Sequence, residues 1–323
     1  HAHDDQLLFD DPAMTPKVSQ GVTTVVVGNC GVSLAPLVRD TVPAPLSEMG
    51  RAFRFATFAQ YVDELRRSPA AINAACLVGH TTLRVATMAD LDRRATEAEL
   101  DAMRALCGEA LEAGAIGVSS GVFYPPARAA DWSEVAALAA LSGAAGGVYT
   151  AHLRDEGDRV IEAIDEACKV AAAAGTPLVL SHHKVAGRAN FGRSRETLEH
   201  IGRAAAQQPV SFDVYPYTAG ASMLSEALCA AAARTIVTWS EPHPEAAGRE
   251  LGDVARSMGL TQADAIQALL PGGAIYFLMH DADVQRILSH PEAMIGSDGV
   301  ATQHPHPRLW GAFTRVLGHY SRD

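Results

Sequence analysis

The sequence lacks any uninterrupted apolar run of the roughly 18 to 20 residues that a helix needs to span a bilayer. Positive charge is also scarce, because 26 basic residues stand against 37 acidic residues and leave a net charge of −11. A nucleic acid or an anionic membrane needs a basic face on its partner, so the acidic charge balance argues against these two classes of partner. It does not argue against a small substrate, whose binding site can be locally positive.

Cysteine is sparse and scattered. The sequence contains five cysteines, and none of them has CxxC spacing. An odd, dispersed set of this kind in a large chain favours a reducing compartment over a disulfide framework. We therefore expect a cytoplasmic protein.

Short β-branched segments alternate with longer Ala- and Leu-rich amphipathic stretches, the pattern of repeated βα units around a parallel sheet. With 323 residues the chain is long enough for one (β/α)8 barrel, a fold of about 250 residues. We therefore predict the α/β class and a TIM-type barrel. Its strands are expected at residues 1–3, 22–28, 75–79, 116–120, 148–152, 178–182, 210–215 and 294–298. Helices are expected between most of them, at 96–113, 132–142, 158–174 and 195–205.

This barrel is expected to be incomplete at both ends. No hydrophobic run precedes His1, so the body of the first strand would lie outside the sequence. After the last strand only a loop and a partial helix remain. We therefore interpret residues 1–323 as one barrel domain of a longer protein.

Residues 221–274 interrupt the alternation of strands and helices. They contain the run Trp239-Ser240-Glu241-Pro242-His243-Pro244 and a helical stretch at 261–270, and a strand-like run follows at 274–279. We interpret this segment as an insertion between strands seven and eight, and expect it to form a lid over the site.

Polar residues follow the predicted strands at their carboxyl ends, where a barrel of this type carries its chemistry. Chance could place one or two of them there, whereas seven favour a shared active site. These residues are His3, Cys30, His80, His152, His182, Tyr215 and Asp298.

The histidines and the cysteine among them predict a zinc site. Two histidines at i and i+2, as in His1 and His3, point to the same side of an extended strand. Imidazole and thiolate are preferred zinc donors, and a catalytic site keeps one position open for water. A free cysteine is more often an inert core residue, but Cys30 lies in a turn directly after a buried strand. The candidate ligands are His1, His3, Cys30, His152, His182 and Asp298.

Asp298 is a candidate for catalysis as well as for metal binding. A carboxylate beside a metal-bound water can bind the metal, or it can carry a proton from that water to a leaving group. The alternative is an ordinary Asp-Gly turn. Its position directly after the last predicted strand favours catalysis.

Several motifs are spread over essentially the whole chain. They are His1-Ala2-His3-Asp4-Asp5, residues 21–31, residues 120–126, Ser181-His182-His183-Lys184, Tyr215-Pro216-Tyr217, Ser297-Asp298-Gly299 and His304-Pro305-His306-Pro307-Arg308. With these motifs the sequence resembles the D-aminoacylase (N-acyl-D-amino-acid deacylase) family of the metal-dependent amidohydrolases. The family also has a small β domain, built from segments on both sides of the barrel, and we expect it to be absent here.

The resemblance implies zinc-dependent hydrolysis of an N-acyl-D-amino acid to a carboxylate and a free D-amino acid. Many relatives bridge two metals through a carboxylated lysine on the fourth strand, but residues 116–120 contain no lysine. The family that this chain resembles uses a cysteine after the second strand instead. By this resemblance one tight zinc site consists of Cys30, His152 and His182, and a second, weaker site of His1, His3 and Asp298.

The resemblance also indicates residues that bind the substrate. The guanidinium of Arg308 can hold an α-carboxylate with two parallel hydrogen bonds, although a surface arginine in a Pro-rich loop is the alternative. For a tyrosine at a strand end, packing with a satisfied hydroxyl is nearly as strongly favoured as substrate binding. Positions that resemble substrate contacts of the family are Tyr124, Lys184, Tyr215 and Ser222.

Two alternatives remain at this stage. A cyclic amidase, related to dihydropyrimidinase or dihydroorotase, uses similar ligands, but the missing lysine and the presence of Arg308 count against it. The chain could also be a catalytically inactive fragment that binds metal or ligand without turnover. The sequence predicts no oligomeric state.

Overall fold

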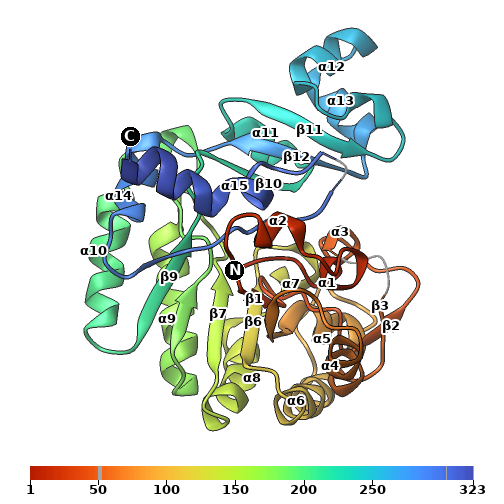
Figure 1. Ribbon diagram of the computed structural model, residues 1–323, viewed down its shortest axis with the longest axis vertical. Coiled ribbons are helices and arrows are strands. Elements are labelled where there is room, and N and C mark those ends of the chain that lie inside the picture. Colours follow the sequence, from red (N-terminus) through yellow and green to blue (C-terminus); the bar gives the residue numbers. More distant parts are fainter. Residues whose placement is uncertain (50–52, 303, 323) are drawn as a thin grey trace.

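Parallel strands form the centre of the computed structural model, which describes residues 1–49, 53–302 and 304–322 (Figure 1). Six of them pair in the order β13-β9-β8-β7-β6-β5, and β1 pairs in parallel with β4. Their bounds are β1 (Thr24–Val27), β4 (Asn73–Cys76), β5 (Val78–Gly79), β6 (Gly117–Gly121), β7 (Val148–His152), β8 (Leu178–Leu180), β9 (Val210–Val214) and β13 (Ala293–Ile295). The predicted α/β class with a parallel sheet is confirmed.

Further contacts join the two sheets into a ring. β4 and β5 follow one another with only Leu77 between them, so they connect the two sheets on one side. On the other side the amide of Ala2 donates to the carbonyl of Val26 at 3.1 Å, and His3 forms a parallel bridge with Val300. The N-terminal residues therefore lie between β1 and the segment after β13.

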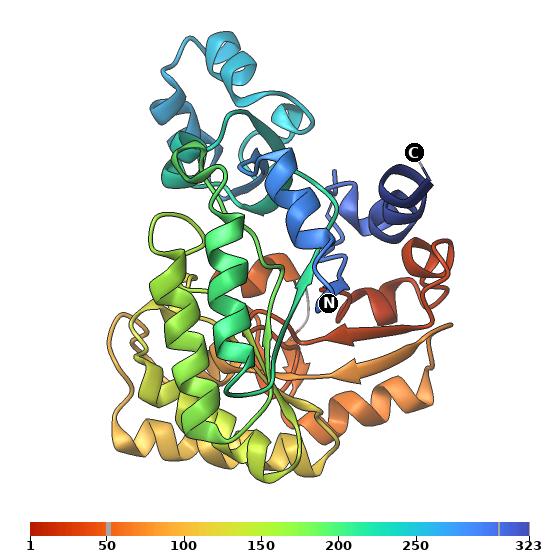
Figure 2. The same ribbon diagram turned by 90° about the vertical axis from the view of Figure 1, so that its left-hand side faces the viewer.

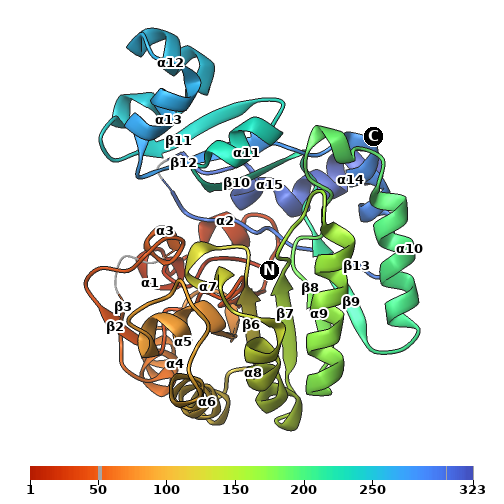
Figure 3. The ribbon, with the colours of Figure 1, turned by 180° about the vertical axis from the view of Figure 1, so that it is seen from behind.

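Helices cover the outside of this ring (Figures 2 and 3). In α6 a capping box starts the helix, because Thr96 and Glu99 satisfy each other's backbone amides. Its inward face carries Met103, Cys107 and Ala110, which are buried at helical spacing. The covering helices are α4 (Phe58–Arg67), α5 (His80–Thr87), α6 (Glu97–Glu112), α8 (Trp132–Ala144), α9 (Val160–Ala174), α10 (Ser194–Ala205) and α14 (Asp281–Leu288).

Between β9 and β13 the chain forms a separate small sheet, at the top of Figure 1. Its three antiparallel strands have the order β10-β12-β11 and pack with two helices around buried residues such as Val237, Val254 and Leu269. The unit runs from β10 to β12 and thus extends slightly beyond residues 221–274. Its elements are β10 (Ala219–Met223), α11 (Glu226–Ala231), β11 (Thr235–Ser240), α12 (Leu251–Met258), α13 (Gln262–Leu269) and β12 (Gly272–Phe277).

Short elements connect the rest of the chain. They are α1 (Leu7–Asp10), α2 (Thr15–Val18), β2 (Leu37–Arg39), α3 (Leu46–Met49), β3 (Phe53–Phe55), α7 (Pro125–Arg128), α15 (Arg308–Arg315), the 3-10 turns Arg188–Asn190 and Pro244–Ala246, and a π-helical turn Val316–Arg322. Within the three described ranges, no helix combines the length and the apolar composition that a membrane crossing requires.

Candidate metal centre

Cys30 lies in a tight turn after β1, at the carboxyl edge of the ring. This turn packs closely against β6, and the glycine at position 121 of β6 makes that possible. A Cβ on Gly121 would come within 2.0 Å of the Cys30 carbonyl oxygen. Cys30 itself has a left-handed backbone with φ 53°, and His182 and Asp298 share this conformation with φ 39° and 46°. It is sparsely populated for residues with a side chain and costs about 1 to 3 kcal/mol each. The fold therefore holds three site residues in a strained backbone conformation.

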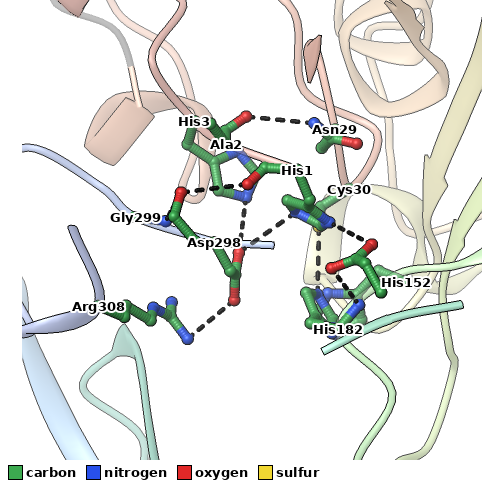
Figure 4. Close-up of polar contacts among 12 residues, drawn as sticks. His1, Ala2, His3, Asn29, Cys30, His152, His182, Asp298, Gly299 and Arg308 are labelled. Carbon is green, nitrogen blue, oxygen red and sulfur yellow. Dashed lines mark hydrogen bonds and ion pairs between the residues drawn. The ribbon is translucent and has the colours of Figure 1, made fainter. Parts of the chain in front are cut away.

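Four potential metal ligands converge at this edge (Figure 4). Atoms from His1, Cys30, His182 and Asp298 all lie within 4.8 Å of one another. The sulfur of Cys30 is 3.3 Å from Nε2 of His182 and 3.6 Å from Nε2 of His1. Nε2 of His1 lies 3.3 Å from a carboxylate oxygen of Asp298. Segments that are far apart in the sequence thus bring one thiol, two imidazoles and one carboxylate together.

His152 belongs to the same cluster. Its ring centre is 4.4 Å from that of His182, and with His182 and Glu156 it forms a second group whose ligand atoms lie within 4.8 Å of one another. Both ring nitrogens of His152 are buried, and neither has a hydrogen-bond partner among the described residues. Burial and the neighbouring His182 lower the pKa of His152 and keep it neutral, which is the form that binds metal. An unsatisfied neutral imidazole at this position fits a metal ligand.

The charges of the cluster also fit a cation. Burial opposes ionisation of the Cys30 thiol, but His182 and His1 bring its pKa well below the usual range. The same balance holds at Asp298, where Arg308 and His182 outweigh burial and lower the pKa well below its usual value. A thiolate, a carboxylate and imidazoles are a donor set that zinc prefers.

His3 lies at the margin of this cluster. Its Nε2 is 3.1 Å from Asp298, whereas its buried Nδ1 has no partner among the described residues. The backbone of His3 is fixed by a hydrogen bond from its amide to the carbonyl of Gly299. The structure thus brings all six candidate ligands to one edge of the ring.

Two acidic residues that the sequence analysis did not single out orient these candidate ligands. Asp213 lies 3.0 Å from Nδ1 of His1 and accepts a hydrogen bond from the backbone amide of His182. Glu156 lies 3.1 Å from Nδ1 of His182. Carboxylates commonly hold metal-binding histidines in this way. Each left a weak signal, because Asp213 is a charged residue in an apolar strand and Glu156 follows His152 by four positions.

A pocket opens beside the cluster, and all five predicted substrate residues line it. Arg308 is only 2% exposed, so the alternative of a surface arginine is wrong. Its Nη1 lies 2.8 Å from Asp298 and its guanidinium 4.7 Å from the Tyr215 ring centre. Nζ of Lys184 contacts Glu156 at 2.5 Å and Nδ1 of His182 at 2.7 Å. The five lining residues are Tyr124, Lys184, Tyr215, Ser222 and Arg308.

Other histidines have structural partners. His80 is buried and contacts Glu134 at 2.9 Å. His183 points away from the cluster and contacts the hydroxyl of Thr197 at 3.0 Å. His306 accepts a hydrogen bond from the amide of Arg308 and so supports the loop that carries this arginine.

Comparison with known proteins identifies the family, although no family model matches the chain. A D-aminoacylase of Alcaligenes xylosoxydans xylosoxydans is 53% identical over 326 residues, which cover 100% of this chain and 67% of that protein. The chain belongs to the D-aminoacylase family of amidohydrolases. An N-acyl-D-aspartate deacylase of the same organism is 54% identical over 321 residues, which cover 98% of this chain and 64% of that protein.

The chain thus spans about two thirds of the length of these D-aminoacylase relatives. Both relatives carry the names of hydrolases that act on linear amides, and neither is named for a cyclic amide. The resemblance inferred from the motifs is confirmed.

A solved structure of a family member has the same fold. It is the N-acyl-D-glutamate deacylase of Bordetella bronchiseptica, in complex with zinc and a phosphonate inhibitor that mimics the tetrahedral intermediate of the reaction. The TM-score is 0.96 at 42% identity, and the match covers 100% of this chain and 69% of that one.

Proposed function

We propose that this chain carries the active site of a zinc-dependent N-acyl-D-amino-acid deacylase, which hydrolyses the amide to a carboxylate and a free D-amino acid. The observation that carries the proposal is the cluster of thiolate, imidazoles and carboxylate beside a pocket with a buried arginine. Similarity to deacylases of N-acyl-D-amino acids over nearly all of this chain supports the substrate class. We also infer that the ring of strands is a (β/α)8 barrel, with residues 221–274 as its lid.

We assign zinc ligation to both groups of donors. Cys30, His152 and His182 would form the tight site, supported by the two unsatisfied nitrogens of His152. His1, His3 and Asp298 would line a second, weaker site, supported by the contacts of Asp298 with both histidines. Zinc, when bound, supplies a Lewis acid and makes hydroxide available near neutral pH.

Asp298 is the proton carrier in this proposal. Its pKa is held well below the usual value, despite burial, by Arg308 and His182, so it begins the reaction as a carboxylate. It can therefore accept a proton from the attacking water and return it to the nitrogen of the departing amine. Its carboxylate contacts His1, His3 and Arg308, which fix its direction.

Arg308 would bind the α-carboxylate of the substrate. Its Nη1 is engaged with Asp298 and its Nη2 with the carbonyl of Ala221, but the buried Nε has no partner among the described residues. A donor that is unsatisfied in the free protein is suited to a carboxylate that arrives with the substrate. Lys184, Tyr215, Tyr124 and Ser222 line the same pocket and would add polar contacts.

The experiment is a zinc assay combined with hydrolysis of N-acetyl-D-methionine and its L enantiomer. The proposal expects bound zinc and turnover of the D substrate alone. A zinc-free protein, or equal rates on both enantiomers, would contradict it. Zinc binding without turnover of either substrate would support the inactive-fragment alternative.

A further inference from the structure

The pocket wall formed by α3 and the small sheet contains a carboxylate that the proposed reaction does not use. Glu48 lines the pocket from α3, while Leu228 and Tyr276 line it from the unit that runs from β10 to β12. Figures 1 and 3 both show α3 directly below the small sheet. Glu48 is thus close to both the barrel side and the insertion side of the pocket.

The other charged groups of the pocket are paired. Arg308 pairs with Asp298, and Lys184 pairs with Glu156. The carboxylate of Glu48, by contrast, forms no hydrogen bond or ion pair with any residue in the described ranges. It is the only acidic residue of the pocket lining that lacks such a partner within these ranges.

Neighbouring tyrosines do not compensate this charge. Glu48 lies close enough to Tyr124 and Tyr276 to raise the pKa of each, although burial is the larger cause for both. The hydroxyl of Tyr276 is engaged elsewhere, since it donates to the carbonyl of Met223 at 2.6 Å and accepts from the amide of Ser225. Burial accordingly raises the pKa of Glu48 to about 8. A cation placed beside such a buried, unpaired carboxyl group stabilises its ionised form.

The surroundings of Glu48 fit a side chain with an apolar stem and a positive tip. Apolar side chains line the same pocket, and the aliphatic stems of lysine and arginine pack well against such surfaces. These lining residues include Phe123, Leu228, Leu278 and Met279.

We propose that Glu48 determines the preference of this site for side-chain charge, favouring N-acyl-D-amino acids with basic side chains over those with acidic ones. The proposal rests on the proposed function. It also goes beyond what similarity offers, because a D-aminoacylase and an N-acyl-D-aspartate deacylase are almost equally identical to this chain.

The test compares kcat/KM for N-acetyl-D-lysine and N-acetyl-D-glutamate in the zinc-loaded chain, with N-acetyl-D-methionine as a neutral reference. The assay is run at about pH 8.5, just above the pKa of Glu48. In Glu48→Gln the lysine-to-glutamate ratio is expected to fall about tenfold or more, since one direct charge interaction is removed. Glu48→Lys is expected to reverse the preference, which damage to the fold would not produce.

Glu112→Gln is the matched control. Glu112 ends α6 at the exposed surface, outside the pocket, so the same chemical change there should leave the ratio unaltered. Calorimetric binding of D-lysine and D-glutamate, the two products, repeats the comparison without turnover. A ratio within about twofold of the wild-type ratio in both Glu48 variants overturns the inference. Absence of turnover in the zinc-loaded wild-type chain, with binding that still prefers D-lysine and depends on Glu48, contradicts the proposed function instead.

Discussion

Nη1 of Arg308 lies 2.8 Å from a carboxylate oxygen of Asp298, and both side chains are buried at the edge of the cluster of candidate metal ligands. This contact has two consequences. Arg308 keeps the Asp298 carboxylate ionised, and its Nε, which has no hydrogen-bond partner in the described part of the chain, is the donor that we propose for the substrate carboxylate. A change at Arg308 should therefore affect both substrate binding and the proposed proton transfer by Asp298.

Arg308→Lys is expected to lower kcat/KM on N-acetyl-D-methionine by roughly 10- to 100-fold, mainly through KM, because an ammonium cannot reproduce the planar fork. The measurement is a separate determination of kcat and KM. N-acetyl-D-methioninamide, which lacks the free carboxylate, is the control substrate. Its kcat/KM should fall much less than that of the free acid. An unchanged KM for the free acid would remove Arg308 from the binding site.

Cys30→Ala should lower zinc content and reduce kcat/KM by roughly 100-fold or more, because it removes the only thiolate of the cluster. Elemental analysis after dialysis measures the metal, and activity measures the consequence. Cys229→Ala, at a partly buried thiol in α11, is the matched control and should retain zinc. Unchanged zinc stoichiometry in Cys30→Ala would refute the ligand assignment.

Asp213→Asn tests the support behind the ligands. The amide keeps the shape of the side chain but loses the charge that faces Nδ1 of His1. Zinc affinity is expected to fall about 10- to 100-fold, as is usual when an orienting carboxylate is lost. Competition with a chelator measures the affinity, and circular dichroism checks the fold. An affinity equal to wild type would mean that Asp213 only fixes the backbone of His182.

The strands and the convergence of polar residues at their carboxyl ends could be predicted because both depend on local patterns. A β-branched run such as 24–27 predicts a strand by itself, and parallel strands then bring their carboxyl ends to one edge. That His3, Cys30 and Asp298 lie together follows from these two rules. Their roles as ligands and proton carrier stay predictions.

The contacts of Asp213 and Glu156 could not be predicted in the same way. The pair of His1 and Asp213 spans 212 positions and exists only when the ring closes. The left-handed backbone of Cys30 and His182 left no pattern either, since tertiary packing imposes it on residues that do not favour it. Pairing of β10 with β12 across about 50 residues is likewise a long-range event.

Gly121→Ala tests how the fold positions Cys30. The added Cβ would lie 2.0 Å from the Cys30 carbonyl oxygen, and this neighbour is backbone that cannot rotate away. We expect a loss of about 1 to 3 kcal/mol in the free energy of unfolding, as for overpacked sites, together with weaker zinc binding because the turn must shift. Thermal unfolding and zinc content measure the two effects.

Gly108→Ala is the matched control for this substitution. Gly108 lies within α6, and a Cβ there meets nothing within 4 Å. Alanine is the better helix former, so this variant should be more stable by about 0.5 to 1 kcal/mol and should bind zinc normally. Gly121→Ala could also unfold at the wild-type temperature and keep its zinc. The turn would then tolerate displacement, and the close contact at Gly121 would not be required to position the Cys30 thiolate.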